Sequence, residues 1–450
     1  MSLSTQELWQ KYVTALTNYV TGGQFDPSSQ AICFAGNTLM VDLADADAEI
    51  SSYNIYNIGN LMPKWSAAYA PNSDLIGSYA SYLNYINLGG DPNPNLDSQI
   101  NIAAGNVTAA QTNFATQLTN SLTGYGNAKT AMPNLTWAQY IQQFGATYTA
   151  ARSALSAALL AYQNLLRKKM GADYDSLLDA QSRVGFTGGA RDTVSSNGYN
   201  MKGKYGTQSP LGSTTTLPGA TPAAPSTNLT EILLPSYNLD ASFTTAYQQW
   251  QTKSVNNQVD VGPIVVSGTS TASQFSSFGW SAGMDASLFG DFFSFFGSGS
   301  ASGSNIKSAW QSTNFSLQVS YTGLQTFPIT PGSWFQQSFI TNYKNSLYPN
   351  APQFFGENGS LSLMPYELII GFEPKIQLTL DNQDYQDFKS AYQANASASI
   401  GIGPFRIGTA SFSTYGSKED AAFNDSTSTI TIGPIKSTLP LLLGVICSKL

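Results

Sequence analysis

Apolar residues recur every three or four positions through most of residues 1–184, which is the spacing of an amphipathic helix. Ser4-Thr5-Gln6-Glu7 has the pattern of a capping box at the start of the first such stretch, and Thr136-Trp137-Ala138-Gln139 has it at another. A second helical region is expected over about 28–58, with an interruption near Gly36. Because short connections favour antiparallel neighbours, we predict a bundle of about five or six helices.

From about residue 231 the apolar period changes to two, which is typical of half-buried strands. Alternation is clear over Phe315–Tyr321 and Tyr366–Phe372, and again in a long run over Tyr392–Ile402. The run Leu441–Cys447 is continuously apolar and has the length of a core strand. These patterns predict an α+β fold, in which an N-terminal α-helical bundle precedes a C-terminal antiparallel β-rich domain, sandwich or barrel-like.

The two halves are separated by residues 185–230, which read as a linker. The stretch 206–228 is rich in Pro, Gly, Ser and Thr and has no apolar period. The expected organisation is therefore a helical bundle at 1–184, the linker at 185–230 and the antiparallel β domain at 231–450.

Charge is scarce in this chain. Charged residues make up 10% of the 450 residues, against roughly 25% in an ordinary soluble domain. A surface of hydroxyls and amides repels copies of itself weakly, which favours a homo-oligomer or a larger self-assembly. The net charge is −7 and no basic stripe is present, so nucleic acid is not an expected partner.

The chain has no histidine, which excludes Ser-His-Asp and Cys-His catalysis and histidine-based zinc sites. The spacing Gly279–Gly283 matches a G-x-S-x-G nucleophile elbow, but its serine has no imidazole to take the proton. Glu367 and Glu373 share a strand face at a separation of roughly 20 Å. Glycoside hydrolysis needs about 5–10 Å, although a carboxylate from another strand stays possible. We predict a protein that is not an enzyme and has no cofactor or metal site.

Ser448, Lys449 and Leu450 match the peroxisomal import address, which an import receptor reads at an extreme C-terminus. The alternative is that this tail simply follows a buried strand. The N-terminus lacks the pattern of a signal peptide, and Cys33 and Cys447 read as buried free thiols. The expected location is the peroxisome in a eukaryote, and otherwise the cytoplasm or release without a classical signal peptide.

Five phenylalanines form the most apolar segment that could be exposed, and the glycine- and serine-rich GSGSASGS follows them. Such a patch would contact a membrane or a partner. The alternative is that the rings fill the space between the sheet and the helical bundle. The five are Phe289, Phe292, Phe293, Phe295 and Phe296.

Together these features predict a non-catalytic, self-associating structural or matrix protein, imported into peroxisomes through Ser-Lys-Leu in a eukaryote. The alternative is a membrane-acting protein of the pore-forming toxin type, with a helical bundle and a β-rich domain. A carbohydrate-binding module is a third hypothesis, motivated by the 24 tyrosines.

Overall fold

The computed structural model describes residues 4–44, 48–90, 93–132, 135–171, 173–184, 198–201, 232–259, 261–270, 291–296, 315–394, 399–408 and 421–450. The chain divides into two compact units. The first, which we call the sheet unit, comprises Met1–Tyr82, Val184–Phe335 and Pro352–Leu450, and the second, the helical unit, comprises Leu83–Arg183 and Gln336–Ala351. Helices and antiparallel sheets coexist, which confirms the α+β class.

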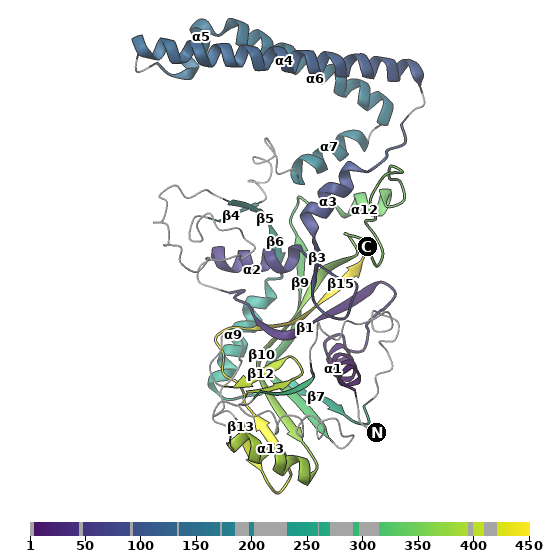
Figure 1. The fold of residues 1–450 in the computed structure, drawn as a ribbon, viewed down its shortest axis with the longest axis vertical. Coiled ribbons are helices and arrows are strands. Elements are labelled where there is room, and N and C mark those ends of the chain that lie inside the picture. Colours follow the sequence, from purple (N-terminus) through teal and green to yellow (C-terminus); the bar gives the residue numbers. More distant parts are fainter. Residues whose placement is uncertain are drawn as a thin grey trace. The chain divides into compact units, whose positions relative to one another are not determined.

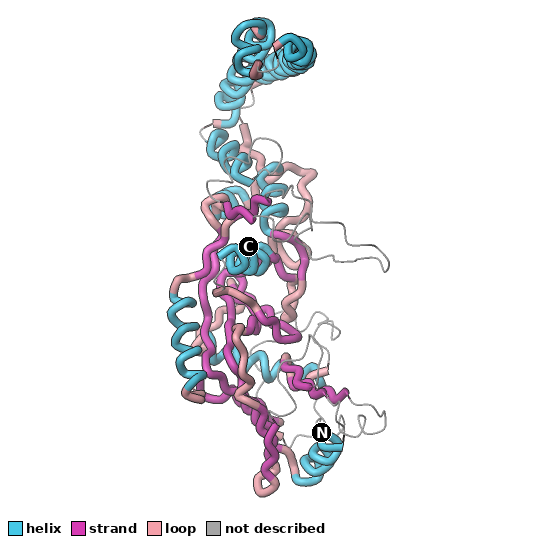
Figure 2. Tube along the Cα trace, turned by 90° about the vertical axis from the view of Figure 1, so that its left-hand side faces the viewer, coloured by secondary structure: helices cyan, strands magenta, loops and turns pink. Residues whose placement is uncertain are grey.

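An eight-stranded antiparallel sheet is the centre of the sheet unit (Figure 1). Its two long strands, β9 (Ser316–Pro331) and β10 (Leu363–Thr379), pair along most of their length. Figure 2 shows long strands of this sheet running side by side, in magenta. Beside one half of this pair lie β15 (Leu441–Lys449), β1 (Gln30–Met40) and β6 (Tyr237–Leu239).

The other half of the sheet has the strand order β7-β9-β10-β14-β13, and we call it the hairpin half. It adds β7 (Val261–Ser267) on the β9 side, and β14 (Thr429–Ile432) and β13 (Ala421–Asn424) on the β10 side. Within the described residues, β7 and β13 are its two edge strands.

The apolar run near the C-terminus forms β15, which lies between β1 and β10. Both faces of this strand are covered, so Leu441–Cys447 is buried throughout, as expected for a core strand. Cys33 on β1 and Cys447 on β15 are buried free thiols.

The prediction of a helical region over 28–58 is wrong for its first part. Gln30–Met40 forms β1, and the helix α2 begins only at Ala48 and ends at Asn60. Ala31–Ala35 is buried, because this run has no polar face and pairs with β15 of the sheet. Pairing with a distant strand therefore outweighed the local helical spacing.

The prediction of one long strand over Tyr392–Ile402 is also wrong in part. Asn382–Ala394 forms the helix α13, and the strand β11 covers only Ser399–Ile402. Tyr385, Phe388 and Tyr392 are spaced by three and four and are buried together, which explains the helix.

Helices precede most of the sheet along the chain, as predicted, but the described helices before residue 184 are divided between the two compact units. The helix α1 (Thr5–Val20) and α2 belong to the sheet unit, while in the helical unit α4 packs along α6. An ion pair between Asp97, near the start of α4, and Lys169, near the end of α6, fixes their antiparallel direction. The remaining helices are α3 (Leu75–Asn84), α4 (Pro94–Ala131), α5 (Trp137–Phe144), α6 (Ala146–Met170), α7 (Asp173–Val184), α9 (Ser242–Val255) and α12 (Gln337–Tyr343).

Both capping boxes are present. The Glu7 amide donates to Ser4 Oγ at 3.1 Å, and the Gln139 amide donates to Thr136 Oγ1 at 3.3 Å. The helix that Thr136 begins is shorter than its apolar spacing suggested, because it ends at Phe144 and α6 starts after Gly145.

The compact units divide the chain differently from the expected domains, since Met1–Tyr82 joins the sheet. Most of the expected linker 185–230 lies outside the described residues, apart from β4, which pairs with β5. The short strands are β2 (Leu61–Pro63), β3 (Pro71–Asp74), β4 (Gly198–Met201), β5 (Ile232–Pro235), β8 (Phe293–Phe296) and β12 (Phe405–Gly408).

Candidate functional site

Two long connections leave the hairpin half at the same end. Residues 268–315, the first connection, join β7 to β9, and residues 380–428, the second connection, join β10 to β14. Their four ends lie in one row of Cα partners, which runs Ser267, Ser316, Thr379, Thr429. As these bounds show, the two connections are nearly equal in length.

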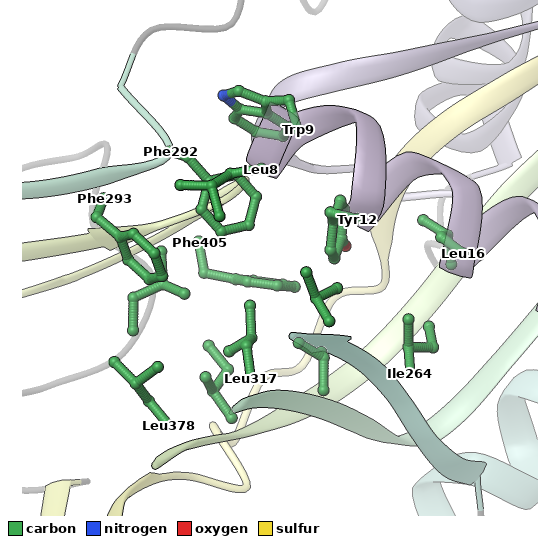
Figure 3. Packing of buried hydrophobic residues seen from close by; sticks show 14 of the residues in the cluster. Leu8, Trp9, Tyr12, Leu16, Ile264, Phe292, Phe293, Leu317, Leu378 and Phe405 are labelled. Carbon is green, nitrogen blue, oxygen red and sulfur yellow. The ribbon is translucent and has the colours of Figure 1, made fainter. Parts of the chain in front are cut away.

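The described parts of the two connections pair with each other. β8 belongs to the first connection, and β11 and β12 belong to the second. They form a three-stranded antiparallel sheet in the order β12-β11-β8, which we call the covering sheet. Its buried side chains, such as Phe293 and Phe405, share one apolar cluster with Leu317 and Leu378 of the hairpin half (Figure 3).

The β8–β11 ladder of the covering sheet has the register of the β9–β10 ladder, whereas the β11–β12 ladder is offset by one residue from the β10–β14 ladder. Ser316 of β9 pairs with Thr379 of β10, and Ser294 of β8 pairs with Gly401 of β11. Ser294 precedes Ser316 along the chain by the same number of positions as Gly401 follows Thr379. The β8–β11 ladder therefore uses the pairing that the β9–β10 ladder would reach if it simply continued.

The midpoints of the two connections touch. The first midpoint falls at residues 291–292 and the second at residue 404, and the Gly403 amide donates to the Phe292 carbonyl at 2.7 Å. Gly403 has a φ of 54°, which suits glycine in the tight turn between β11 and β12. Residues 292 and 403 would again be opposite each other in the continued β9–β10 register.

Helix α1 covers this meeting point. Trp9 and Tyr12 face the ring of Phe292 from α1 (Figure 3), with the centroids of Trp9 and Phe292 5.1 Å apart. The Tyr12 and Tyr321 hydroxyls lie 3.5 Å apart, and burial raises the pKa of Tyr12 well above its usual value. The apolar face of α1 that the sequence predicts is thus used to bury the middle of the first connection.

The phenylalanine segment is not an exposed patch where it is described. Phe292 is 0% exposed and Phe293 is 4% exposed, and they pack between the sheet and α1. Phe295 and Phe296 lie in β8, with side chains outside the described set, and Phe289 lies outside the described residues. Any contact of Phe292 or Phe293 with a membrane or a partner therefore requires this region to rearrange.

A polar clamp joins the beginning and the end of the second connection. Lys389 and Tyr385 of α13 both donate to Asp425 in the β13–β14 turn, at 2.6 and 2.8 Å. The hydrogen bond from Lys389, and to a lesser extent the one from Tyr385, holds the pKa of Asp425 below its usual range. Asp425 is therefore ionised at neutral pH and can accept both hydrogen bonds.

Glu373 joins the sheet to α9. This residue of β10 is 1% exposed and has a φ of 46°. Its carboxylate accepts hydrogen bonds from Ser254 of α9 at 2.7 Å and from Thr322 of β9 at 3.2 Å. Lys436 Nζ, in the segment after β14, lies 3.3 Å from the same carboxylate.

The left-handed conformation of Glu373 marks a change of face along β10. Ile369 before it and Ile376 after it belong to the same apolar cluster, although strict alternation would put them on opposite faces. Glu373 is engaged by these partners, while Glu367 is half-buried and its pKa is raised by burial. These are the two carboxylates that the sequence suggested for acid–base chemistry. Glu373 is fully buried and hydrogen-bonded to Ser254 and Thr322, whereas Glu367 is only half-buried.

The C-terminal tail is part of the sheet. Ser448 pairs with Gln30 and Met364, and the Lys449 amide donates to the Ser29 carbonyl at 2.9 Å. The Leu450 amide donates to the Ser362 carbonyl at 3.2 Å. An import receptor could read these residues only after they leave the edge contacts that they make here.

Sequence reasoning considered Glu373 only for acid–base chemistry, and it missed the link from Glu373 to α9, the role of Asp425 and the register shared by the two ladders. The equal lengths of the two connections and the turn-forming Gly290-Asp291 and Gly403-Pro404 near their midpoints were the available signals. The spacing Gly279–Gly283 lies outside the described residues.

Comparisons of the chain with protein-family models, with curated proteins and with solved structures find no match. Among the helices of the described ranges, none combines the length and the apolar character needed to cross a bilayer.

Proposed function

We propose that this protein acts on membranes, as pore-forming toxins do, by straightening its two connections into hairpins that enter the bilayer. The first hairpin would continue β7 and β9, and the second would continue β10 and β14. The observation that carries the proposal is the register shared by the β8–β11 and β9–β10 ladders. The self-association expected from the low charge becomes assembly on the membrane in this proposal.

The shared register makes the rearrangement simple. Two stretches of equal length, 297–315 and 380–398, lie between the two ladders. If both stretches become extended, β8 and β11 keep each other as partners, and only β12 must shift, by one residue, to continue the register of β14. A slip of one residue sends every side chain of a strand to the other face of the sheet, so preserving the register of β8 and β11 preserves which of their faces is apolar.

The connections are long enough. Each contains two arms of about 24 residues, which extend to roughly 80 Å at about 3.3 Å per residue. A strand that crosses a bilayer at a tilt needs about 9–11 residues. The arms could therefore cross the bilayer and still leave residues above it.

The scarcity of charge within the arms fits the same proposal. Each arm contains an uncharged run long enough for such a strand, and the four runs are 268–284, 292–306, 390–405 and 407–417. Asp291 and Arg406 lie next to the midpoints, where a hairpin tip would reach water beyond the bilayer.

The alternating pattern over Tyr392–Ile402 supports the proposal as well. In the folded chain Tyr392 and Ala394 belong to α13, although the run alternates as a strand does. A segment with helical spacing in its first part and strand spacing in its second is suited to two conformations.

Import into peroxisomes is not part of this proposal. It would require Ser448, Lys449 and Leu450 to leave β1, β10 and the residues just before these strands, and to lose the backbone hydrogen bonds of Lys449 and Leu450. A strand end that is hydrogen-bonded on both sides gives no support to an address read from a free tail.

We expect the purified protein to release a small dye from vesicles of phosphatidylcholine and phosphatidylserine. Release should depend steeply on protein concentration, because several copies would be needed, and a large dextran should leave more slowly than the dye. Fluorescence dequenching measures both. Equal release of dye and dextran would indicate general lysis, and no release at micromolar protein would refute the proposed function.

A further inference from the structure

The sheet edges of the hairpin half point to a surface for self-assembly, and this inference rests on the proposed function. β13 lies on the outer edge of β14, and its residues belong to the second connection. If that connection straightens to continue β14, then β13 becomes part of the same strand and leaves the β14 edge. The conversion proposed above therefore removes the partner of β14.

A bare strand edge is costly in a bilayer. A backbone N–H or C=O group without a partner is strongly unfavourable there, because lipid offers no hydrogen bonds. The edges of β14 and β7 and their continuations would both be unpaired. These two strands lie on opposite sides of β9 and β10, so they cannot pair within one sheet.

The strand directions decide what can satisfy the two edges. β7 is antiparallel to β9, β9 to β10 and β10 to β14. β14 of a second copy placed beside β7 would therefore run antiparallel to it and continue the alternation of the sheet. We propose that β7 of one copy pairs with β14 of the next copy in the membrane-bound state.

The composition and length of the two edges fit this pairing. Neither Val261–Ser267 nor Thr429–Ile432 contains a charged residue. Edge strands usually carry charged residues, which prevent them from pairing with other copies of the chain. Pro263 has no N–H, so the edge of β7 that can pair regularly is Ile264–Ser267. This stretch has the same length as β14 and as the β13 strand that now covers it.

The geometry also gives the residues to test. Val265, Gln318, Gln377, Thr431 and Ala422 are successive Cα partners in one row across β7, β9, β10, β14 and β13. Val265 is 44% exposed on the outer edge strand. If the next copy continues this row, Thr431 of that copy lies beside Val265.

Two preparations test the interface, one carrying Val265→Cys and the other carrying Thr431→Cys. They are mixed, bound to the same vesicles, oxidised gently and separated on a non-reducing gel. We expect a cross-linked heterodimer on vesicles, at least tenfold more than in solution or from either variant alone. A third variant, Thr429→Cys, reports a register that is shifted by two residues, which keeps the side chain on the same face.

The native thiols do not interfere, because Cys33 and Cys447 are buried. If the mixture releases dye and forms no heterodimer with Thr431→Cys or Thr429→Cys, the interface is wrong and the proposed function stands. If the wild-type protein releases no dye, the proposed function is refuted and the interface is refuted with it.

Discussion

A disulfide between β13 and β14 is expected to abolish dye release. Ala422 and Thr431 are directly opposite in the folded chain, so the double variant Ala422→Cys/Thr431→Cys can form a cross-strand disulfide. This bond fixes β13 beside β14 and prevents the second connection from continuing β14. We expect release to fall at least tenfold after oxidation and to recover when the disulfide is reduced.

The two single-cysteine variants, treated with the same oxidant, are the matched controls and should release dye as the wild type does. Binding of the oxidised double variant to vesicles, measured by co-sedimentation, should be unchanged. The disulfide blocks only the straightening of the second connection, which follows binding. Undiminished release by the fully oxidised variant would show that β13 stays on β14 throughout, which is incompatible with the straightening of the second connection.

Replacement of Glu373 is expected to have the largest effect on stability. Glu373→Ala leaves the buried Thr322 hydroxyl and Ser254 without their acceptor, and should lower the free energy of unfolding by about 3 kcal/mol. Glu373→Gln keeps an acceptor oxygen and should cost about 1–1.5 kcal/mol. Denaturant unfolding, followed by tryptophan fluorescence near Trp250 on α9, measures both.

Lys436→Met is the matched control. The Lys436 side chain is 48% exposed, so its ion pair with Glu373 is screened and its loss should cost less than about 1 kcal/mol. The expected order of destabilisation is therefore Glu373→Ala, Glu373→Gln, Lys436→Met. If Glu373→Ala were no more destabilising than Lys436→Met, the buried hydrogen bonds would not be what holds α9 to the sheet.

Local patterns predicted the elements whose structure depends on nearby residues. The capping box at Ser4, the apolar face of α1 and the alternation Phe315–Tyr321 each led to the right helix or strand. The continuous run Leu441–Cys447 was recognised as a core strand, since only a strand covered on both faces can be apolar throughout. Most strands of the large sheet follow the change of apolar period near residue 231, but β1 lies before it.

Features that depend on distant pairing could not be predicted in the same way. Residues 30–40 form a strand only because β15, at the other end of the chain, is available beside them. The left-handed Glu373 follows from a change of face that no periodicity reveals. The relation between Ser294 and Gly401 becomes visible only when the partners of both ladders are known.

Membrane action of the proposed kind requires the two connections to extend without losing the register of β8 and β11. The direct test is dye release by the double variant Ser294→Cys/Gly401→Cys. These residues are cross-strand partners in the folded chain, and a Cβ at position 401 would meet the Ser294 side chain, so a disulfide can join them.

The same residues remain partners if both connections straighten in register, so this disulfide should be compatible with the folded and the membrane-bound forms. We predict that the oxidised variant releases dye from vesicles within about twofold of its reduced form. Loss of release on oxidation, with recovery on reduction, would show that β8 and β11 must separate or slip, and would contradict the account.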